Sequence, residues 1–323
     1  MDSIESGTGK LIKAYKSNEF SSIKNIFTSN DVLYGKLRPY LKKYFKPHFS
    51  GLCSSEFWVL SSVKISQDFL YHFVSTEYFN NETNKTCGTK MPRADWKKIS
   101  KLDIYYPNLN EQHKISCFLD QIDRKIDVFC SKIAILKKYK EGIMIKCYEL
   151  AKNPLISLSK LVKNNTILLG RGEIIPKQNG TFPVYSSSAA NNGLFCFRNK
   201  YSFDEELITW SIDGGGKPFL RNKHKFSITN VCGYAKILDL NKFSYSWLYI
   251  NFWNSWRKIK FDYTTKAHPS VIEKLYKIKS LDIESQMKIE KILTYINNKI
   301  DYLIKELNDV TLTKESLLRS LFF

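Results

Sequence analysis

The sequence is poor in the residue patterns that build disulfide frameworks and metal sites. Its seven cysteines are odd in number, are scattered along the chain, and form no C-x-x-C pair. Its five histidines never stand at the spacing of metal ligands. We therefore expect reduced thiols, as in proteins of the cytosol, and we predict neither a disulfide framework nor a bound metal.

Long hydrophobic runs are missing as well. No apolar stretch approaches the roughly 20 residues that span a bilayer. The opening residues MDSIESGTGK have no apolar core behind a basic start, which a secretory signal requires. These absences predict a cytoplasmic protein that has no membrane as a partner.

The familiar catalytic motifs are absent or incomplete. The glycines at 214–216 lack the G-x-x-x-x-G-K-[ST] spacing of a phosphate loop, and GTGK at 7–10 has Ile4 where the first glycine belongs. No G-x-S-x-G nucleophile elbow occurs. We therefore predict that the chain is not an enzyme, with no catalytic residues and no cofactor bound by this chain.

Basic residues, in contrast, are abundant. Lys and Arg number 50 against 31 Asp and Glu, which gives a net charge of +19. Such an excess favours a polyanionic partner, nucleic acid before membrane. An AT-rich genome would also raise the lysine content, and only eight of the basic residues are arginine.

A long amphipathic helix is predicted for residues 109–150. Its apolar residues recur at alternating steps of four and three, the 3.5-residue period of a coiled-coil seam, which is narrower than the face of an ordinary globular helix. One slot of the pattern holds Lys140. The predicted seam comprises Ile115, Leu119, Ile122, Ile126, Phe129, Ile133 and Leu136.

The C-terminal residues 281–323 repeat this helix. Residues 112–148 align without gaps on 286–322, a shift of 174 positions, and ten of these 37 positions are identical. The charged slot is repeated too, because Lys314 falls on Lys140. The predicted second seam comprises Ile289, Leu293, Ile296, Ile300, Leu303, Leu307 and Val310.

The repeat decides the predicted architecture. Each long helix follows a globular α+β unit, so we expect two globular domains at 1–108 and 151–280, with their helices at 109–150 and 281–323. Two helices with matching seams most simply pack as an antiparallel coiled coil with pseudo-twofold symmetry. The alternative is that each helix packs only on its own globular unit.

The repeat extends into the globular units. DVLYGKLRPY at 31–40 falls on ELITWSIDGG at 206–215, each a polar residue entering a short strand. Aromatic residues at helical spacing predict a helix within 243–261. Met1 falls opposite Pro176, so residues 155–175 have no counterpart upstream, and we expect the first unit to lack an opening strand and turn of about 20 residues.

Basic residues interleaved with aromatic and small polar residues mark both units as candidate DNA readers. Arginine can grip guanine in two places, lysine can hold phosphate, and serine can read either. Singly, each is more often a solvated surface residue. The candidates are Lys36, Arg38, Lys42, Lys43, Lys90, Arg93, Arg171, Lys177, Ser187, Lys217, Arg221 and Lys266.

Several stretches resemble a known family. YYPNLNEQHKISCFLDQIDRKIDVFCSKIAILKKYKEGIMIK closely resembles the helical region of the DNA-specificity subunit of type I restriction–modification enzymes. GTKMPRADWKKISKLDI, DVLYGKLRPYLKK and ITWSIDGGGKPFLRNKHKFSITNVCG resemble other parts of that subunit. The resemblance covers nearly the whole chain, in the order recognition domain, helix, recognition domain, helix.

The resemblance implies a subunit without chemistry of its own. Each target-recognition domain would read one half of a bipartite double-stranded DNA sequence, and the paired helices would set the gap and dock two modification (methyltransferase) subunits. S-adenosylmethionine, ATP and Mg would then belong to partner subunits, including restriction subunits with translocase and nuclease activity. The late start of the first unit leaves an alternative open, namely a truncated or recombined subunit that acts mainly as an interaction scaffold.

Overall fold

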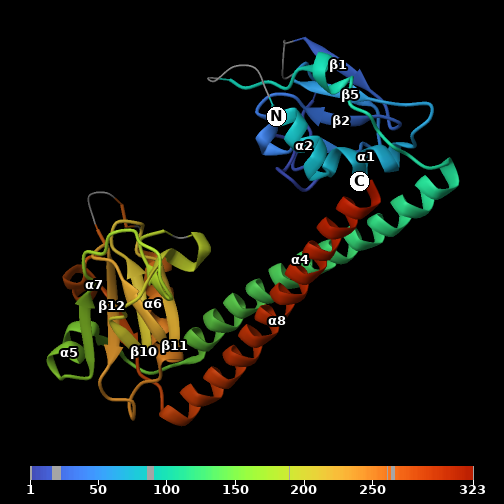
Figure 1. Cartoon of the computed structure of the whole chain (residues 1–323). Helices are drawn as coiled ribbons and strands as arrows, with labels where there is room; N and C mark the ends of the chain where they lie inside the picture. Colours follow the sequence, from blue (N-terminus) through green and yellow to red (C-terminus); the bar gives the residue numbers. More distant parts are fainter. Residues whose placement is uncertain are drawn as a thin grey trace. The chain divides into compact units, whose positions relative to one another are not determined.

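The computed structural model divides into two compact units, each combining strands with helices. Unit 1 is Met1–Lys132 with Leu303–Phe323, and unit 2 is Ile133–Tyr302. Both long helices therefore pass through both units (Figure 1). The structure describes residues 2–16, 23–85, 91–188, 190–259, 261–262 and 266–322.

The described residues of unit 1 form two small antiparallel sheets and three short helices. The sheet elements are β1 (Lys24–Phe27) paired with β4 (Gly51–Ser54), and the three-stranded order β3 (Tyr44–Phe45), β2 (Val32–Gly35), β5 (Phe57–Leu60). The helices are α1 (Gln67–Ser75), α2 (Glu77–Asn84) and α3 (Trp96–Ile99), and a 3-10 turn covers Pro39–Leu41.

The helices of unit 1 begin at polar caps and cover one face of β2. Ser66 caps α1 by accepting from the Phe69 N–H, and Thr76 caps α2 in the same way from Phe79. Val32 and Tyr34 point from β2 into the core that Phe69 shares with these helices. Alternate residues of β2 therefore face the helices, and Leu33 packs in a separate cluster on the other face.

Unit 2 is built on a six-stranded sheet. Its strand order is β7 (Ile167–Arg171), β12 (Cys232–Ile237), β10 (Phe203–Ser211), β11 (Pro218–Ile228), β8 (Phe182–Tyr185) and β9 (Leu194–Arg198). All pairs are antiparallel except β11 with β8. A second sheet pairs β6 (Leu155–Ser157) with β13 (Lys277–Lys279), and the short helices are α5 (Leu158–Lys163), α6 (Tyr245–Lys258) and α7 (Pro269–Leu275).

The predicted aromatic helix is α6, which confirms that expectation. Ser244 caps it by accepting from the Trp247 N–H. Trp247 and Phe252 are fully buried against Trp210 of β10, so the aromatic periodicity supplies the main core of unit 2. Each fully buried side chain of this size stabilises the fold by about 2–3 kcal/mol.

The long helices are α4 (Leu109–Leu150) and α8 (Ile283–Phe322). None of the predicted seam residues on either helix is exposed, and Leu119 and Leu293 are almost completely buried. Within unit 1, Leu119 of α4 and Leu318 of α8 share one core cluster. Within unit 2, Met144 of α4 and Leu293 of α8 share another.

The two charged slots of the seam make equivalent polar contacts. In unit 2, the Lys140 ammonium donates to Asn297 Oδ1 at 2.7 Å. In unit 1, the Lys314 ammonium pairs with the Asp123 carboxylate. The lysine lies on α4 in the first pair and on α8 in the second pair. Each residue of one pair corresponds to a residue of the other by the same shift of 174 positions. The polar slots therefore obey the repeat as closely as the apolar ones.

These pairs differ in charge, and this difference predicts opposite effects of the same substitution. Burial lowers the pKa of Lys140, whose partner is a neutral amide. Lys140→Met should leave the free energy of unfolding of unit 2 unchanged or higher at pH 7. Lys314→Met should lower that of unit 1 by roughly 1–2 kcal/mol, because it leaves Asp123 half-buried and unpaired.

The pH dependence has a definite sign. A folded pKa below the unfolded value means that the Lys140 charge destabilises unit 2 at neutral pH and that this cost fades as the pH rises toward the ordinary lysine value. The increase in the free energy of unfolding of unit 2 caused by Lys140→Met should therefore become smaller over the same alkaline pH range. Amide hydrogen exchange of α4 and α8 in each unit measures both effects, and equal losses in the two variants would contradict the assignment.

Each long helix is tied to its globular unit by one glutamine. Gln112 Oε1 accepts from the Ser66 N–H at 2.8 Å, and its Nε2 donates to the carbonyls of Lys64 and Pro107. Gln286 accepts from the Ser244 N–H at 2.7 Å and donates to Lys242 and Leu281. Both glutamines are fully buried. Each long helix is thereby fastened to the N-cap of α1 or α6.

Backbone hydrogen bonds correct the predicted alignment of the globular units by one residue. The Ala94 N–H donates to the Lys36 carbonyl, and the Ala267 N–H donates to that of Ile212. Lys36 therefore corresponds to Ile212, which places Val32 on Ile208, and both of these face the helices. The ungapped alignment put Val32 on Leu207, which faces the opposite side of its strand.

Candidate nucleic-acid interface

Three of the predicted basic residues of unit 1 converge beyond the end of β2. A β-bridge joins Leu37 to Arg93, and the Arg38 N–H donates to the Pro92 carbonyl at 2.8 Å. Arg38 adopts a left-handed conformation with φ of 50° and is exposed. The half-buried Lys36 precedes it. This loop pair, residues 36–38 with 92–93, presents basic groups on the surface of unit 1.

Arg93 is held in place by a carboxylate. Its Nε donates to Glu56 Oε2 and its Nη2 to Glu56 Oε1, both at 3.0 Å. This pairing lowers the pKa of Glu56. The Arg93 side chain is nearly half exposed, so the pair contributes little stability and a phosphate can compete with Glu56 for the guanidinium.

The other candidates of unit 1 lie elsewhere. Lys42 Nζ lies 3.4 Å from Glu77 at the start of α2, and Lys43 is buried at 8% exposure. We expected Lys43 at the surface, but it is buried because it directly precedes β3 and its carbonyl accepts from the Gly35 N–H at the end of β2. Lys90 lies outside the described residues.

Unit 2 carries the counterpart of the first loop pair. Its residues lie between β10 and β11 and just before α7, where the Lys266 ammonium pairs with Asp213 at 2.8 Å. Lys217 follows the three glycines, half-buried. A side chain at Gly214 would meet the carbonyl of Ser187 at 2.5 Å, so only glycine lets these two segments approach. Lys266, Lys217 and Ser187 therefore gather at one end of the sheet.

Arg221 lies inside unit 2 at 3% exposure, not on the surface where we expected it. Its guanidinium stacks on the ring of Tyr185 at 3.7 Å, and its Nε donates to Thr209 Oγ1 at 3.0 Å. Burial lowers its pKa to about 10. Aromatic stacking at these positions draws the side chain inward, where it supports the strands behind the loop.

The last two candidates flank this region. Arg171 ends β7 exposed, and its Nε donates to the Asn230 carbonyl. Lys177 is exposed in a segment without regular structure between β7 and β8. No contact in the described part of unit 2 brings either of them to Lys217 or Lys266.

Comparisons with known proteins agree with this arrangement. The family model described as "Type I restriction modification DNA specificity domain" matches residues 4–137. The EcoDI specificity subunit of Escherichia coli is 28% identical over 155 residues, which cover 45% of this chain and 34% of that subunit. A Mycoplasma genitalium protein described as a type I specificity subunit is 23% identical, covering 97% of this chain and 85% of its own length. The crystal structure of an S subunit from M. genitalium matches with a TM-score of 0.57 at 17% identity, covering 93% of this chain and 84% of that one.

The matched region begins at residue 4, spans the strands and short helices of unit 1, and ends within α4. Residues 4–137 therefore match a type I specificity domain, and nearly the whole chain is similar to a type I specificity subunit. The chain spans only about a third of the length of the EcoDI subunit, at 34%. The solved relative shows that the chain shares the S-subunit fold.

Sequence reasoning missed a second group of basic and aromatic residues in unit 2. The Lys225 ammonium lies 5.0 Å from the ring of Tyr201 and 5.9 Å from that of Phe182. Lys200 is exposed next to Tyr201. The alternation in FRNKYSF and RNKHKF carries this signal, since strands bring such residues onto one face, where lysines and rings suit a nucleic-acid backbone and bases.

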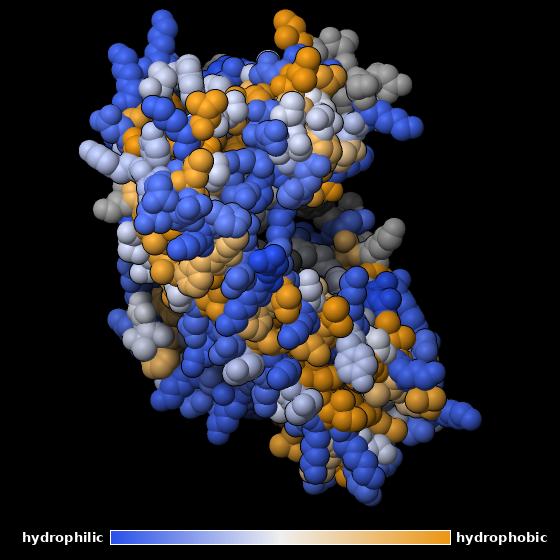
Figure 2. Space-filling view, turned by 90° about the vertical axis from the view of Figure 1, so that its right-hand side faces the viewer, coloured by the Kyte–Doolittle hydropathy of each residue, from blue (hydrophilic) through white to orange (hydrophobic). Residues whose placement is uncertain are grey.

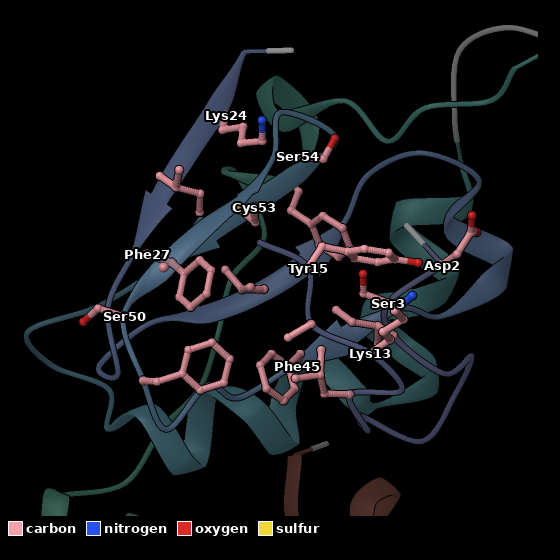
Figure 3. Close-up of a pocket in the computed structure, with 18 of the residues that line it drawn as sticks. Asp2, Ser3, Lys13, Tyr15, Lys24, Phe27, Phe45, Ser50, Cys53 and Ser54 are labelled. Atoms are coloured by element: carbon pink, nitrogen blue, oxygen red, sulfur yellow. The ribbon is translucent and has the colours of Figure 1, made fainter. Parts of the chain in front are cut away.

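A cavity of about 800 Å³ in unit 1 was also missed. It lies between the N-terminal segment and β1, β3 and β4, and Figure 3 shows the rings of Tyr15, Phe27 and Phe45 around it. Lys13 and Lys24 stand at its border. Its walls come from segments far apart in the sequence, so no local sequence pattern predicted it. Aromatic walls with cations at the border suit planar or anionic groups.

One cluster resembles a cation site but already holds two ammonium groups. His72 Nε2 lies 3.0 Å from Asp120 Oδ1, and Asp123 is close by. Lys46 Nζ lies 3.7 Å from Asp120, and Lys314 pairs with Asp123. The hydrogen bond from His72 lowers the pKa of Asp120. The lysines balance both carboxylates, so this cluster joins α1 to the long helices of unit 1.

One face of the molecule can be judged for its hydropathy. In the face shown in Figure 2, hydrophilic residues predominate and hydrophobic residues form smaller areas between them. Among the residues that the structure describes, no helix has the length and apolar character needed to cross a membrane. The exposed hydrophobic residues of this face are therefore surrounded by hydrophilic residues.

Proposed function

We propose that this chain is the DNA-sequence-specificity subunit of a type I restriction–modification complex, in which each unit reads one half of a bipartite double-stranded target. One observation carries the proposal, namely that the repeat supplies both units with a basic loop pair at the same place. Arg93 precedes the residue that bonds to Lys36 in unit 1, and Lys266 precedes the residue that bonds to Ile212 in unit 2. Two equivalent readers on one chain suit a target with two halves.

The chemistry at these loops fits phosphate positioning combined with base readout. Arg38 and Arg93 offer guanidinium groups that can hold phosphate or grip guanine in two places. Lys266 and Lys217 serve as point charges for phosphate. Both surface ion pairs, with Glu56 and with Asp213, are weak enough to exchange their carboxylate for a phosphate.

The long helices serve in this proposal as an antiparallel coiled coil that spaces the two readers. The lysine pairs support this arrangement. Advancing along α4 from Asp123 to Lys140 corresponds to going backward along α8 from Lys314 to Asn297. Buried polar pairs in a coiled-coil seam fix register and orientation at some cost in stability.

Two modification subunits would dock on the outer faces of these helices. Exposed apolar residues occur there in pairs that obey the repeat: Phe118 (49% exposed) with Ile292 (48%), and Val128 (50%) with Tyr302 (54%). Two equivalent apolar patches suit two copies of one partner. The chemistry that needs S-adenosylmethionine, ATP and Mg would then reside on the modification and restriction subunits, and this chain would act without catalysis, in the cytoplasm.

A second candidate function is an interaction scaffold without full sequence recognition. The observation that favours it is that β5 is an edge strand among the described residues, whereas its counterpart β12 lies between two strands. In that case the helices would still dock partners, while only unit 2 would read DNA.

Charge reversal in each unit tests the proposal and separates the two candidates. In the complex with modification subunits, Arg93→Glu and Lys266→Glu should each weaken binding to target DNA about tenfold or more and lower the salt dependence of binding by about one counterion. Lys160→Glu, an exposed lysine of α5, is the matched control and should change neither.

Fluorescence anisotropy on duplexes carrying both half-sites, at several salt concentrations, measures the effects. A loss for Lys266→Glu combined with wild-type binding for Arg93→Glu would support the scaffold. Binding that does not respond to salt or to either variant would overturn the DNA-reading proposal itself.

A further inference from the structure

The cavity of unit 1 lies on the face of β2 that points away from the helices. Leu33 of β2, Phe45 of β3 and Phe57 of β5 line it, and all three are buried in one cluster. Phe27 of β1 joins the same cluster and stands beside the cavity (Figure 3). The volume of about 800 Å³ falls within the range of roughly 300–1,000 Å³ that small-molecule sites have.

The repeat identifies the equivalent space in unit 2. By the corrected alignment, Leu33 corresponds to Thr209. Phe45 pairs with Leu33 and Phe219 pairs with Thr209 in the same way, on strands that flank β2 and β10. Phe45 therefore corresponds to Phe219, and the cavity has its counterpart above β10 and β11.

A planar, nitrogen-bearing group occupies this counterpart in unit 2. The Arg221 guanidinium lies 4.8 Å from the centre of the Phe219 ring, and its Nε donates to Thr209 Oγ1 at 3.0 Å. The residue equivalent to Arg221 in unit 1 is Pro47, two positions after Phe45, and it carries no such group. This face of the repeat therefore accommodates a stacked planar group, and in unit 1 a cavity lies at the same place.

The rings at the cavity leave room for stacking. Phe49 is 45% exposed. Its ring lies 5.8 Å from that of Phe27 at an angle of 65°, and 6.3 Å from that of Phe45 at 51°. Neither neighbour is parallel to Phe49, so neither covers the face of its ring. A planar ligand can stack on Phe49 and bury its exposed part.

The border of the cavity is mainly basic. Lys13, Lys16 and Lys24 line it, against one carboxylate, Asp2, among the described lining residues. The Lys13 ammonium lies 4.6 Å from the ring of Tyr15, so a cation and an aromatic face already stand together there. Figure 3 shows Lys13 and Lys24 at two places on the border. Rings inside and ammonium groups outside suit the base and the phosphate of a nucleotide.

We propose that this cavity binds a nucleotide, with the base stacked on Phe49 above Phe45 and the phosphate at Lys13 or Lys24. The base takes the place that the Arg221 guanidinium takes in unit 2. The ligand, a nucleobase that carries phosphate, has two sources, a free nucleotide or an unpaired nucleotide of bound DNA. The cavity shares no residue with the basic loop pair, so this proposal and the proposed function can fail separately.

Alkylation of the Cys53 thiol, which lines the cavity, reports whether it is occupied in the full chain. Peptide mass spectrometry follows the reaction with N-ethylmaleimide, and the exposed Cys130 is the internal reference. The probes are AMP, adenosine, ribose 5-phosphate, and DNA duplexes with and without one unpaired adenosine. We expect AMP to slow the labelling of Cys53 about fivefold or more, with half-protection below about 1 mM. Adenosine should protect more weakly, and ribose 5-phosphate should not protect.

Two sets of variants separate stacking from charge. Phe49→Leu should raise the AMP concentration for half-protection about fivefold or more, whereas Phe49→Tyr should keep the wild-type value, because only the first removes the stacking ring. Lys13→Glu combined with Lys24→Glu should raise it about tenfold and leave protection by adenosine unchanged. Lys64→Glu, at an exposed lysine of unit 1 outside the cavity, is the matched control and should change neither.

The arms of the experiment also distinguish the two sources. Protection by AMP supports a free nucleotide. Protection by the unpaired adenosine beyond that of the fully paired duplex supports a nucleotide of DNA. The proposal is overturned if neither of them protects Cys53, if ribose 5-phosphate protects as well as AMP, or if Phe49→Leu leaves the protection unchanged.

Discussion

Replacing Gln286 by leucine is expected to lower the free energy of unfolding of unit 2 by about 3–5 kcal/mol. Gln286 is fully buried and makes three hydrogen bonds of 2.7–2.8 Å, accepting from Ser244 and donating to Lys242 and Leu281. Leucine fills a similar volume but bonds to none of these groups. Each buried main-chain group left unsatisfied costs about 1–3 kcal/mol.

The same substitution has matched controls in this chain. Gln112→Leu should cost a similar amount in unit 1, because Gln112 makes the equivalent three bonds. Gln121→Leu, at an exposed position of α4, should stay within about 0.5 kcal/mol of the wild type. Chemical denaturation followed by hydrogen exchange at α6 measures the loss. A wild-type value for Gln286→Leu would show that the start of α8 is not anchored through this side chain.

The anchoring also has a consequence for recognition. The glutamine joins the first turns of α8 to the N-cap of α6, the helix whose aromatic residues form the core beneath β10. The loop of Lys266 and Lys217 rests on the end of that strand. A loosened anchor should therefore weaken DNA binding by unit 2 even though Gln286 lies away from the basic loop.

The two long helices were predictable from sequence because their signals are local. The heptad period marks α4 and α8 within a few turns, and the shift of 174 positions shows that the two belong together. The role of Gln112 and Gln286 was not predictable. Their identity was visible in the repeat, but the N-cap residues that they bond, Ser66 and Ser244, lie more than 40 residues away in the chain.

Strand pairing was predictable only in outline. The ungapped alignment located β2 and β10 but missed their relation by one residue, and in a strand one residue exchanges the two faces. Tyr34 thereby falls on Trp210 and not on Thr209, as the shared core positions require. Loops of unequal length between the strands break the constant shift that holds along the helices.

The basic residues show the same limit. Composition and interleaving pointed to Arg93 and Lys266, which the fold places in equivalent loops. The same pattern also included Arg221, whose burial follows from aromatic neighbours on other strands. It omitted Lys225, which joins Tyr201 and Phe182 only once the sheet has formed. Exposure is a property of the packed sheet, so sequence pattern alone does not assign it.

Under the proposed function, shortening both long helices by one heptad is expected to narrow the gap between the two half-sites of the DNA target without changing either half-site. Residues 127–133 of α4 and 304–310 of α8 lie between the two lysine pairs, so their removal keeps Lys140 with Asn297 and Lys314 with Asp123. Seven residues of helix span about 10 Å. At about 3.4 Å per base pair, a rigid spacer would shorten the gap by about three base pairs.

Methylome sequencing of cells that carry the shortened subunit measures the gap directly. Removing the heptad from α4 alone is the control, because it keeps the seam in phase but separates one lysine from its partner. That variant should assemble poorly and lose methylation at the original target. A four-residue deletion in both helices shifts the 3.5-residue period and should do the same. An unaltered gap in the double-heptad variant would mean that the helices hold the units together without setting the distance between the half-sites.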